Sequence, residues 1–178
     1  MQAASVPVDS DPAQADAPSR PNVLKVFLLV VAVVELLGSL IAVPILFGDI
    51  SDIPGPGLGG WTITAVIAIN PFVAIAALVF ALTDRLRHAI MAIAALGLLD
   101  WLNYLPSFVE HGLSFDASFG SLITLNQFFV LPALCIAGIV FAVRNQRPVL
   151  AAVLASVPLL VNILGVIAFG IGAAIYGF

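Results

Sequence analysis

The sequence predicts an all-α polytopic membrane protein, a bundle of five transmembrane helices with a disordered N-terminal tail. The first observation is composition, because 62% of the 178 residues are hydrophobic and only 9% are charged. An average soluble domain is about 45–50% apolar and about 25% charged. The second is that five apolar stretches are long enough to cross about 30 Å of hydrocarbon, which takes about 20 residues. The third is that these stretches are apolar on all sides, which excludes a β-barrel.

The same composition excludes several classes of protein. Too few polar residues are present to cover a water-soluble domain, which excludes an ordinary soluble enzyme. Six Lys and Arg residues against ten Asp and Glu residues give no basic footprint for nucleic acid. The single cysteine cannot form an intramolecular disulfide, which excludes a disulfide-stapled secreted domain.

The N-terminal segment differs from everything that follows it. Residues 1–22 hold four prolines and three aspartates and no apolar run. Such a segment cannot bury enough apolar surface to offset its ordering entropy. Its acidic start is also unlike the basic start of a secretory signal. We therefore expect residues 1–24 to be a disordered cytoplasmic tail and residues 25–178 to be the transmembrane domain.

The five predicted spans are separated by segments that interrupt helices. The spans are residues 26–47, 61–82, 89–109, 121–143 and 149–176, and the last is long enough to tilt. The intervening segments are a Gly/Pro loop (48–60), a charged turn (83–88), a polar loop (110–120) and a basic turn (144–148). The basic turn ends in Pro148, a residue that suits the first turn of a helix. Short connections of this kind place successive helices side by side and antiparallel.

The six basic residues predict the orientation. They are Arg20, Lys25, Arg85, Arg87, Arg144 and Arg147. With five spans, all six lie on one side of the membrane, and the two loops on the other side carry acidic residues but no basic one. Lys and Arg resist translocation, so we expect the basic side to be cytoplasmic. The chain is then an integral protein of the plasma (inner) membrane, with its N-terminus inside and its C-terminus outside.

Two carboxyl groups lie deep within the predicted spans. Glu35 and Asp100 are each within about 3 Å of the centre of their own span, at roughly 1.5 Å rise per residue. Intramembrane ionisable residues are costly to insert and are functional candidates by default. No Lys, Arg or His lies within the five spans, so an internal ion pair cannot neutralise these carboxyls. A proton, a bound cation or water must do so.

Polar side chains on the other spans complete a predicted midplane site. Asp100, Asn103 and Tyr104 share one face of the third span, which also carries Ser107 and runs toward the outer surface. Small residues flank Glu35, Asn70 and Asn162, as is typical of helix faces that meet other helices. The predicted solute- or ion-binding residues are Glu35, Asn70, Asp100, Asn103, Tyr104, Gln127 and Asn162. The function this predicts is binding or translocation of a small solute, a proton or a cation.

The alternative is a non-catalytic structural or accessory subunit. Asn and Gln side chains often form hydrogen bonds between membrane helices, worth about 0.6 kcal/mol each, without any further role. We expect no enzymatic activity, no catalytic residue, no cofactor and no metal centre, because the sequence has no zinc-ligand cluster, no pair of histidines placed for haem and no membrane-depth base for a serine nucleophile.

Two further patterns concern partners and helix shape. Small residues recur four apart in the fifth span, at Ala151/Ala155, Ala168/Gly172 and Ala173/Gly177. This spacing is typical of a face that meets a second copy, a subunit of a membrane complex or another helix of the same chain, besides the surrounding bilayer. Pro71, Pro132 and Pro158 each remove a backbone hydrogen bond inside a predicted span, which predicts kinks there.

Overall fold

The computed structural model describes residues 23–47, 57–111 and 125–176, and every element within them is helical. Five of these helices are long and apolar enough to cross a membrane, as the sequence predicts. The expected disordered tail lies outside the described residues except for its last two. Most of the 48–60 and 110–120 loops and the start of the fourth predicted span also lie outside them.

Where the structure describes both, the ends of the helices lie within a few residues of the ends of the predicted spans. In chain order they are α1 (Val23–Ala42), a 3-10 segment η2 (Val43–Phe47), α2 (Leu58–Leu82), α3 (Leu86–His111), a π-helical segment η4 (Asn126–Val130), α5 (Leu131–Val143) and α6 (Pro148–Tyr176). Segment η2 continues α1 and segment η4 leads into α5, so the described residues still form five units that are long and apolar enough to cross a membrane.

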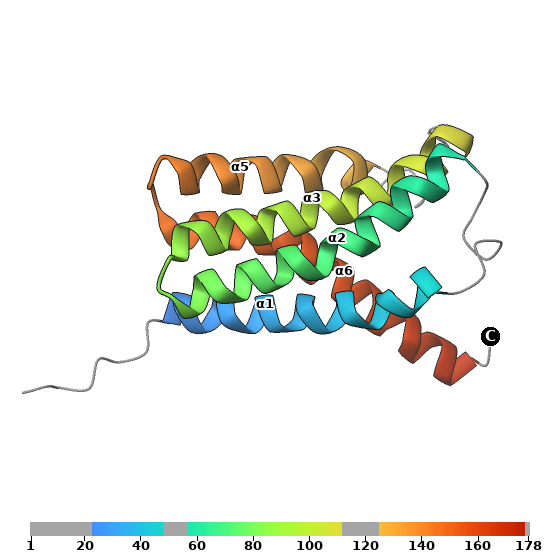
Figure 1. Cartoon of the computed structure of the whole chain (residues 1–178), viewed down its shortest axis with the longest axis horizontal. Helices are drawn as coiled ribbons and strands as arrows, with labels where there is room; N and C mark the ends of the chain where they lie inside the picture. Colours follow the sequence, from blue (N-terminus) through green and yellow to red (C-terminus); the bar gives the residue numbers. More distant parts are fainter. Residues whose placement is uncertain (1–22, 48–56, 112–124, 177–178) are drawn as a thin grey trace, which may run out of the picture.

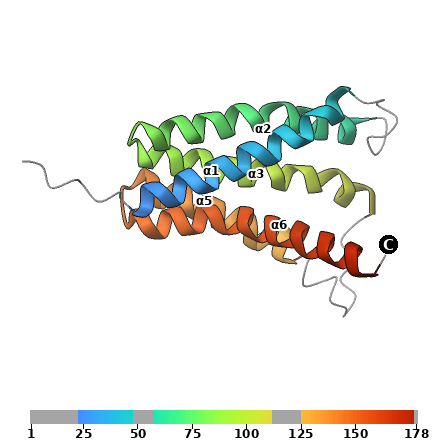
Figure 2. The ribbon, with the colours of Figure 1, turned by 90° about the horizontal axis from the view of Figure 1, so that it is seen from below.

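The five long helices run alongside one another as an up-and-down bundle (Figures 1 and 2). Helix α3 is the central element, because it contacts each of the other four long helices. Helix α6 starts beside α5 and crosses the bundle, so that its C-terminal part lies near α1 (Figure 1). The first and last helices therefore lie on the same side of the central α3.

Small side chains let the helices approach closely. Ala74, Ala77 and Ala81 are fully buried, so the face of α2 that they share with Asn70 points into the bundle, as predicted. Between α5 and α6, a Cβ added at Gly138 would lie only 3.0 Å from the backbone nitrogen of Ala155 and 3.2 Å from the carbonyl of Ala151. The Ala151/Ala155 pair is therefore an internal contact of this chain.

The three prolines that were expected to kink spans do not all lie inside helices. Pro71 and Pro158 lie inside α2 and α6, but Pro132 lies in the first turn of α5, directly after the π-helical segment. The ring of Phe128 in that segment packs against Phe108 of α3, with ring centroids 3.7 Å apart. Pro106 lies inside α3, where no break was predicted.

One end of the bundle collects the described basic residues. It contains the start of α1, the α2–α3 turn and the α5–α6 turn (Figure 1). Lys25 forms an ion pair with Asp84 across 2.7 Å, which ties the start of α1 to the α2–α3 turn. Both turns are tight: Asp84, Asn145 and Arg147 have φ angles of 60°, 51° and 46°. We call this the basic end.

Candidate functional site

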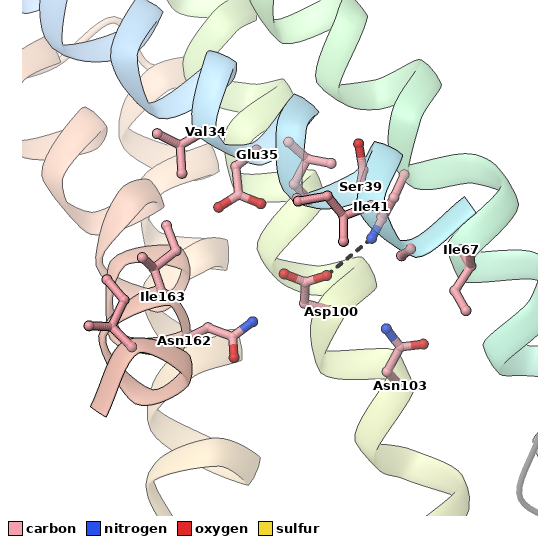
Figure 3. A pocket seen from close by; sticks show the side chains of 14 residues that line it. Val34, Glu35, Ser39, Ile41, Ile67, Asp100, Asn103, Asn162 and Ile163 are labelled. Carbon is pink, nitrogen blue, oxygen red and sulfur yellow. Dashed lines mark hydrogen bonds between the residues drawn. The ribbon is translucent and has the colours of Figure 1, made fainter. Parts of the chain in front are cut away.

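A polar cavity of about 420 Å³ lies between α1, α2, α3 and α6 (Figure 3). Five of the seven predicted site residues line it: Glu35, Asn70, Asp100, Asn103 and Asn162. Each of the four helices contributes at least one of them. The apolar part of the wall is formed by residues such as Val34, Ile67, Leu96 and Ile163. The fold thus gathers polar side chains that are far apart in sequence into one apolar-walled space.

The two carboxyl groups belong to the same cavity. Glu35 projects from α1 and Asp100 from α3, and both point into the space between α1, α3 and α6 (Figure 3). They are close enough to interact electrostatically. The ion pair Lys25–Asp84 at the basic end is the only one among the described residues, so no described cation compensates either carboxyl.

Asn70 connects α2 to this pair. Its side-chain nitrogen donates a hydrogen bond to Oδ1 of Asp100 across 3.1 Å. Among the described residues, no donor reaches Oδ1 of Asn70 or Oδ1 of Asn103, and both oxygens are buried. A buried oxygen without a partner costs free energy, about 1–3 kcal/mol for a neutral group. Two such oxygens and two carboxyl groups therefore line the same cavity.

Asn162 lies at the open side of the cavity. It lies in the middle of α6, where it is exposed at the bundle surface while lining the cavity. Two other lining residues, Ile41 of α1 and Ile167 of α6, are 79% and 51% exposed. The cavity therefore opens sideways between α1 and α6, through a rim that is mainly apolar.

Tyr104 and Gln127 do not line the polar cavity. Tyr104 lies one turn beyond Asp100 on α3 and interacts with it electrostatically. It is not among the residues that line the cavity. Gln127 belongs to the π-helical segment, which packs with α5 on the side of α3 away from α1. Of the residues on the α3 stripe, Asp100 and Asn103 line the cavity, which opens toward α1 and α6 rather than along that stripe.

Gly38 and Ser39 also line the cavity, although they were not among the predicted site residues. Their spacing from Glu35, three and four residues, was the signal that could have identified them. Gly38 leaves space, since no atom lies within 4 Å of where its Cβ would be. The Ser39 hydroxyl donates to the carbonyl of Leu36 across 2.9 Å, so its oxygen can still accept a hydrogen bond.

The cavity offers oxygen ligands only. Carboxylate, amide and hydroxyl oxygens suit hard cations and protons rather than thiophilic metals. Among the described residues, no group of three or more His, Cys, Asp or Glu side chains is placed to hold a metal ion. The two carboxyls can hold a proton or a cation of low charge, assisted by the amide oxygens.

Comparison of the chain with protein-family models, curated proteins and solved structures found no match.

Proposed function

We propose that this chain is a multi-pass membrane protein that binds a proton or a small cation in the polar cavity and passes it on. The observation that carries the proposal is the pairing of Glu35 and Asp100 in one cavity without a compensating cation among the described residues. In a low-dielectric environment two carboxylates repel each other and lose solvation. A bound proton or cation relieves both costs.

The buried acceptor oxygens support the same proposal. Oδ1 of Asn70 and Oδ1 of Asn103 are without a donor among the described residues, and both side chains line the cavity. A bound cation, a hydrated proton or an ammonium group supplies what these oxygens lack. An anion would meet two carboxyl groups and is disfavoured.

The membrane setting is part of the proposal. The mainly apolar exposed surface of all five long helices supports insertion into a bilayer. We place the basic end in the cytoplasm and the chain in the plasma membrane, because the positive side of a membrane protein faces inward. We assign no enzymatic reaction to the cavity, because its lining hydroxyl, that of Ser39, donates to the carbonyl of Leu36 and not to a carboxyl group that could act as its base.

Thermal unfolding of the purified full chain tests binding. The wild type is scanned against sodium, potassium and an organic ammonium chloride at constant ionic strength, and against decreasing pH. A ligand at about 100 times its Kd should raise the midpoint by roughly 5–10 °C. Glu35→Gln with Asp100→Asn should abolish the response, because neutral amides no longer attract a cation. Transport is then followed in proteoliposomes with an ion- or pH-sensitive dye.

Asp84→Asn is the matched control, since it removes a carboxylate that lies at the basic end and outside the polar cavity. It should lower the basal stability slightly and leave the ligand response unchanged. The binding proposal fails if neither pH nor any of the three cations moves the wild-type midpoint. The assignment of residues fails if the double variant responds as the wild type does.

The hydrogen bond between Asn70 and Asp100 favours a second candidate, an accessory subunit. In that case the polar residues hold helices together, and the chain serves a membrane complex or a homo-oligomer through its exposed small-residue faces. Ala168, which is exposed, and Gly172, which is partly exposed, form such a pair on the C-terminal part of α6. The same double variant separates the two candidates: for an accessory subunit, stability falls while the wild type shows no ligand response.

A further inference from the structure

A second cavity, of about 480 Å³, lies at the basic end of the bundle. We call it the basic cavity. Arg85, Arg87 and His88 line it from the α2–α3 turn and the start of α3, and Asn145 and Pro148 line it from the α5–α6 turn. The two turns therefore form opposite walls of one space. None of its residues belongs to the polar cavity.

The charges that face this space are mainly positive. Asp84 is its one acidic lining residue, and Lys25 already neutralises it across 2.7 Å. Arg85 and Arg87 form no ion pair within the described part of the chain. His88 packs its ring against Phe80, with centroids 5.3 Å apart, so its imidazole is held at the cavity wall. Two guanidinium groups thus remain available for an anion.

The backbone adds to this positive potential. Helices α3 and α6 begin at Leu86 and Pro148, so both N-termini lie at the basic cavity. The first N–H groups of a helix lack intrahelical partners, and the helix dipole favours negative charge there. Fork-shaped guanidinium groups beside such N–H groups match the oxygens of a phosphate.

We propose that the basic cavity binds the phosphate of an anionic lipid headgroup. Arg85 and Arg87 border the first turn of α3, which places them where a spanning α3 would leave the hydrocarbon. Apolar lining residues, among them Ile90 and Phe141, continue toward the membrane-spanning part, where the acyl chains of a lipid would lie. Basic cavities between transmembrane helices at the cytoplasmic face suit lipid phosphates for these reasons.

Native mass spectrometry of the full chain tests the proposal. The protein is released from micelles containing equal amounts of phosphatidylglycerol and phosphatidylcholine, and the retained lipids are counted. The wild type should retain about one phosphatidylglycerol per chain in preference to phosphatidylcholine. Arg85→Gln with Arg87→Gln should weaken this retention about thirtyfold, because each substitution removes one charged group that attracts the phosphate.

Arg144→Gln with Arg147→Gln is the matched control. It removes the same charge from the same end, but neither residue lines the basic cavity. It should reduce lipid retention no more than about threefold, through the long-range potential alone. Glu35→Gln with Asp100→Asn should leave lipid retention unchanged, which keeps this test separate from that of the proposed cation site.

Three results would overturn the proposal. One is equal retention of the two lipids by the wild type, which needs no variant to fold. Another is equal loss of retention in the two arginine double variants, because binding would then follow total charge rather than the cavity. The third is full displacement of the lipid by millimolar inorganic phosphate, which would assign the cavity to a soluble phosphate instead of a headgroup.

Discussion

Asn70 is the residue on which the polar cavity depends most directly. It spans the space between α2 and α3, donates to Asp100 across 3.1 Å and keeps its own oxygen buried. The sequence predicts its depth and its face, because Ala74, Ala77 and Ala81 follow it at helical spacing. Its partner could not be predicted, since the choice of partner depends on how far each helix is rotated and tilted against its neighbour.

Replacing Asn70 by alanine should lower the free energy of unfolding by about 1–2 kcal/mol, because Asp100 then loses the hydrogen bond that the Asn70 amide donates to it. Equilibrium unfolding in mixed micelles measures this. Asn162→Ala is the control at similar depth, because Asn162 lines the same cavity but forms no side-chain hydrogen bond within the described residues. Equal losses for the two variants would contradict the role given to Asn70.

For single residues, the sequence predicts depth along a helix and the face of the helix, but not the neighbours in the folded bundle. Depth along a helix follows from counting residues, and this placed Glu35, Asp100 and Asn162 at one level. The stripe on α3 contains Asn103, which lines the cavity, and Tyr104, which does not, because a stripe covers a wide arc and a cavity occupies only part of it. The part of the stripe that faces the cavity depends on where α6 crosses the bundle. The local sequence does not predict that crossing point.

At the scale of elements, the helices are the best predicted part of the fold. Apolar length and the breakers between spans predict the described helix ends to within a few residues. The 3-10 segment Val43–Phe47 and the π-helical segment Asn126–Val130 were not predicted. A proline lies within or close to each segment, and the backbone compensates for a proline in ways that depend on tertiary packing.

The contact between α5 and α6 leads to a prediction at the element scale. Gly138→Ala should destabilise the chain by about 1–3 kcal/mol, because its Cβ would press on the backbone of α6, 3.0 Å from the nitrogen of Ala155. Gly165→Ala has open space and should stabilise α6 by up to about 1 kcal/mol through helix propensity. Unfolding titrations of both variants measure these changes. An unchanged free energy of unfolding for Gly138→Ala would show that α5 and α6 can move apart without cost.

At the scale of the whole molecule, the distribution of charge defines two unlike ends. The described basic residues gather at the start of α1 and at the α2–α3 and α5–α6 turns. The sequence predicts this grouping, because it follows from the number of spans alone. What it does not predict is that two of the turns enclose a common cavity, since that requires α3 and α6 to start side by side.

Cysteine labelling tests the proposed orientation. Cys135 is fully buried and is first replaced by alanine. Thr83→Cys then places a thiol at the basic end, and Phe47→Cys places one at the opposite end, where the native side chain is 84% exposed. A membrane-impermeant maleimide added to intact cells should label the Phe47→Cys variant and reach the Thr83→Cys variant only after permeabilisation. The reverse pattern would show that the basic end faces outward.

The polar cavity is walled by the first and the last of the described helices, with α2 and α3 completing it. The ribosome makes α1 long before α6, and N-terminal segments fold first during synthesis. In a chain that inserts as proposed, Glu35 and Asp100 enter the bilayer while the wall carrying Asn162 is still unmade. Until α6 has been made, only α1, α2 and α3 surround the two carboxyl groups. The polar cavity is thus complete only once α6, the last of the described helices, has been made.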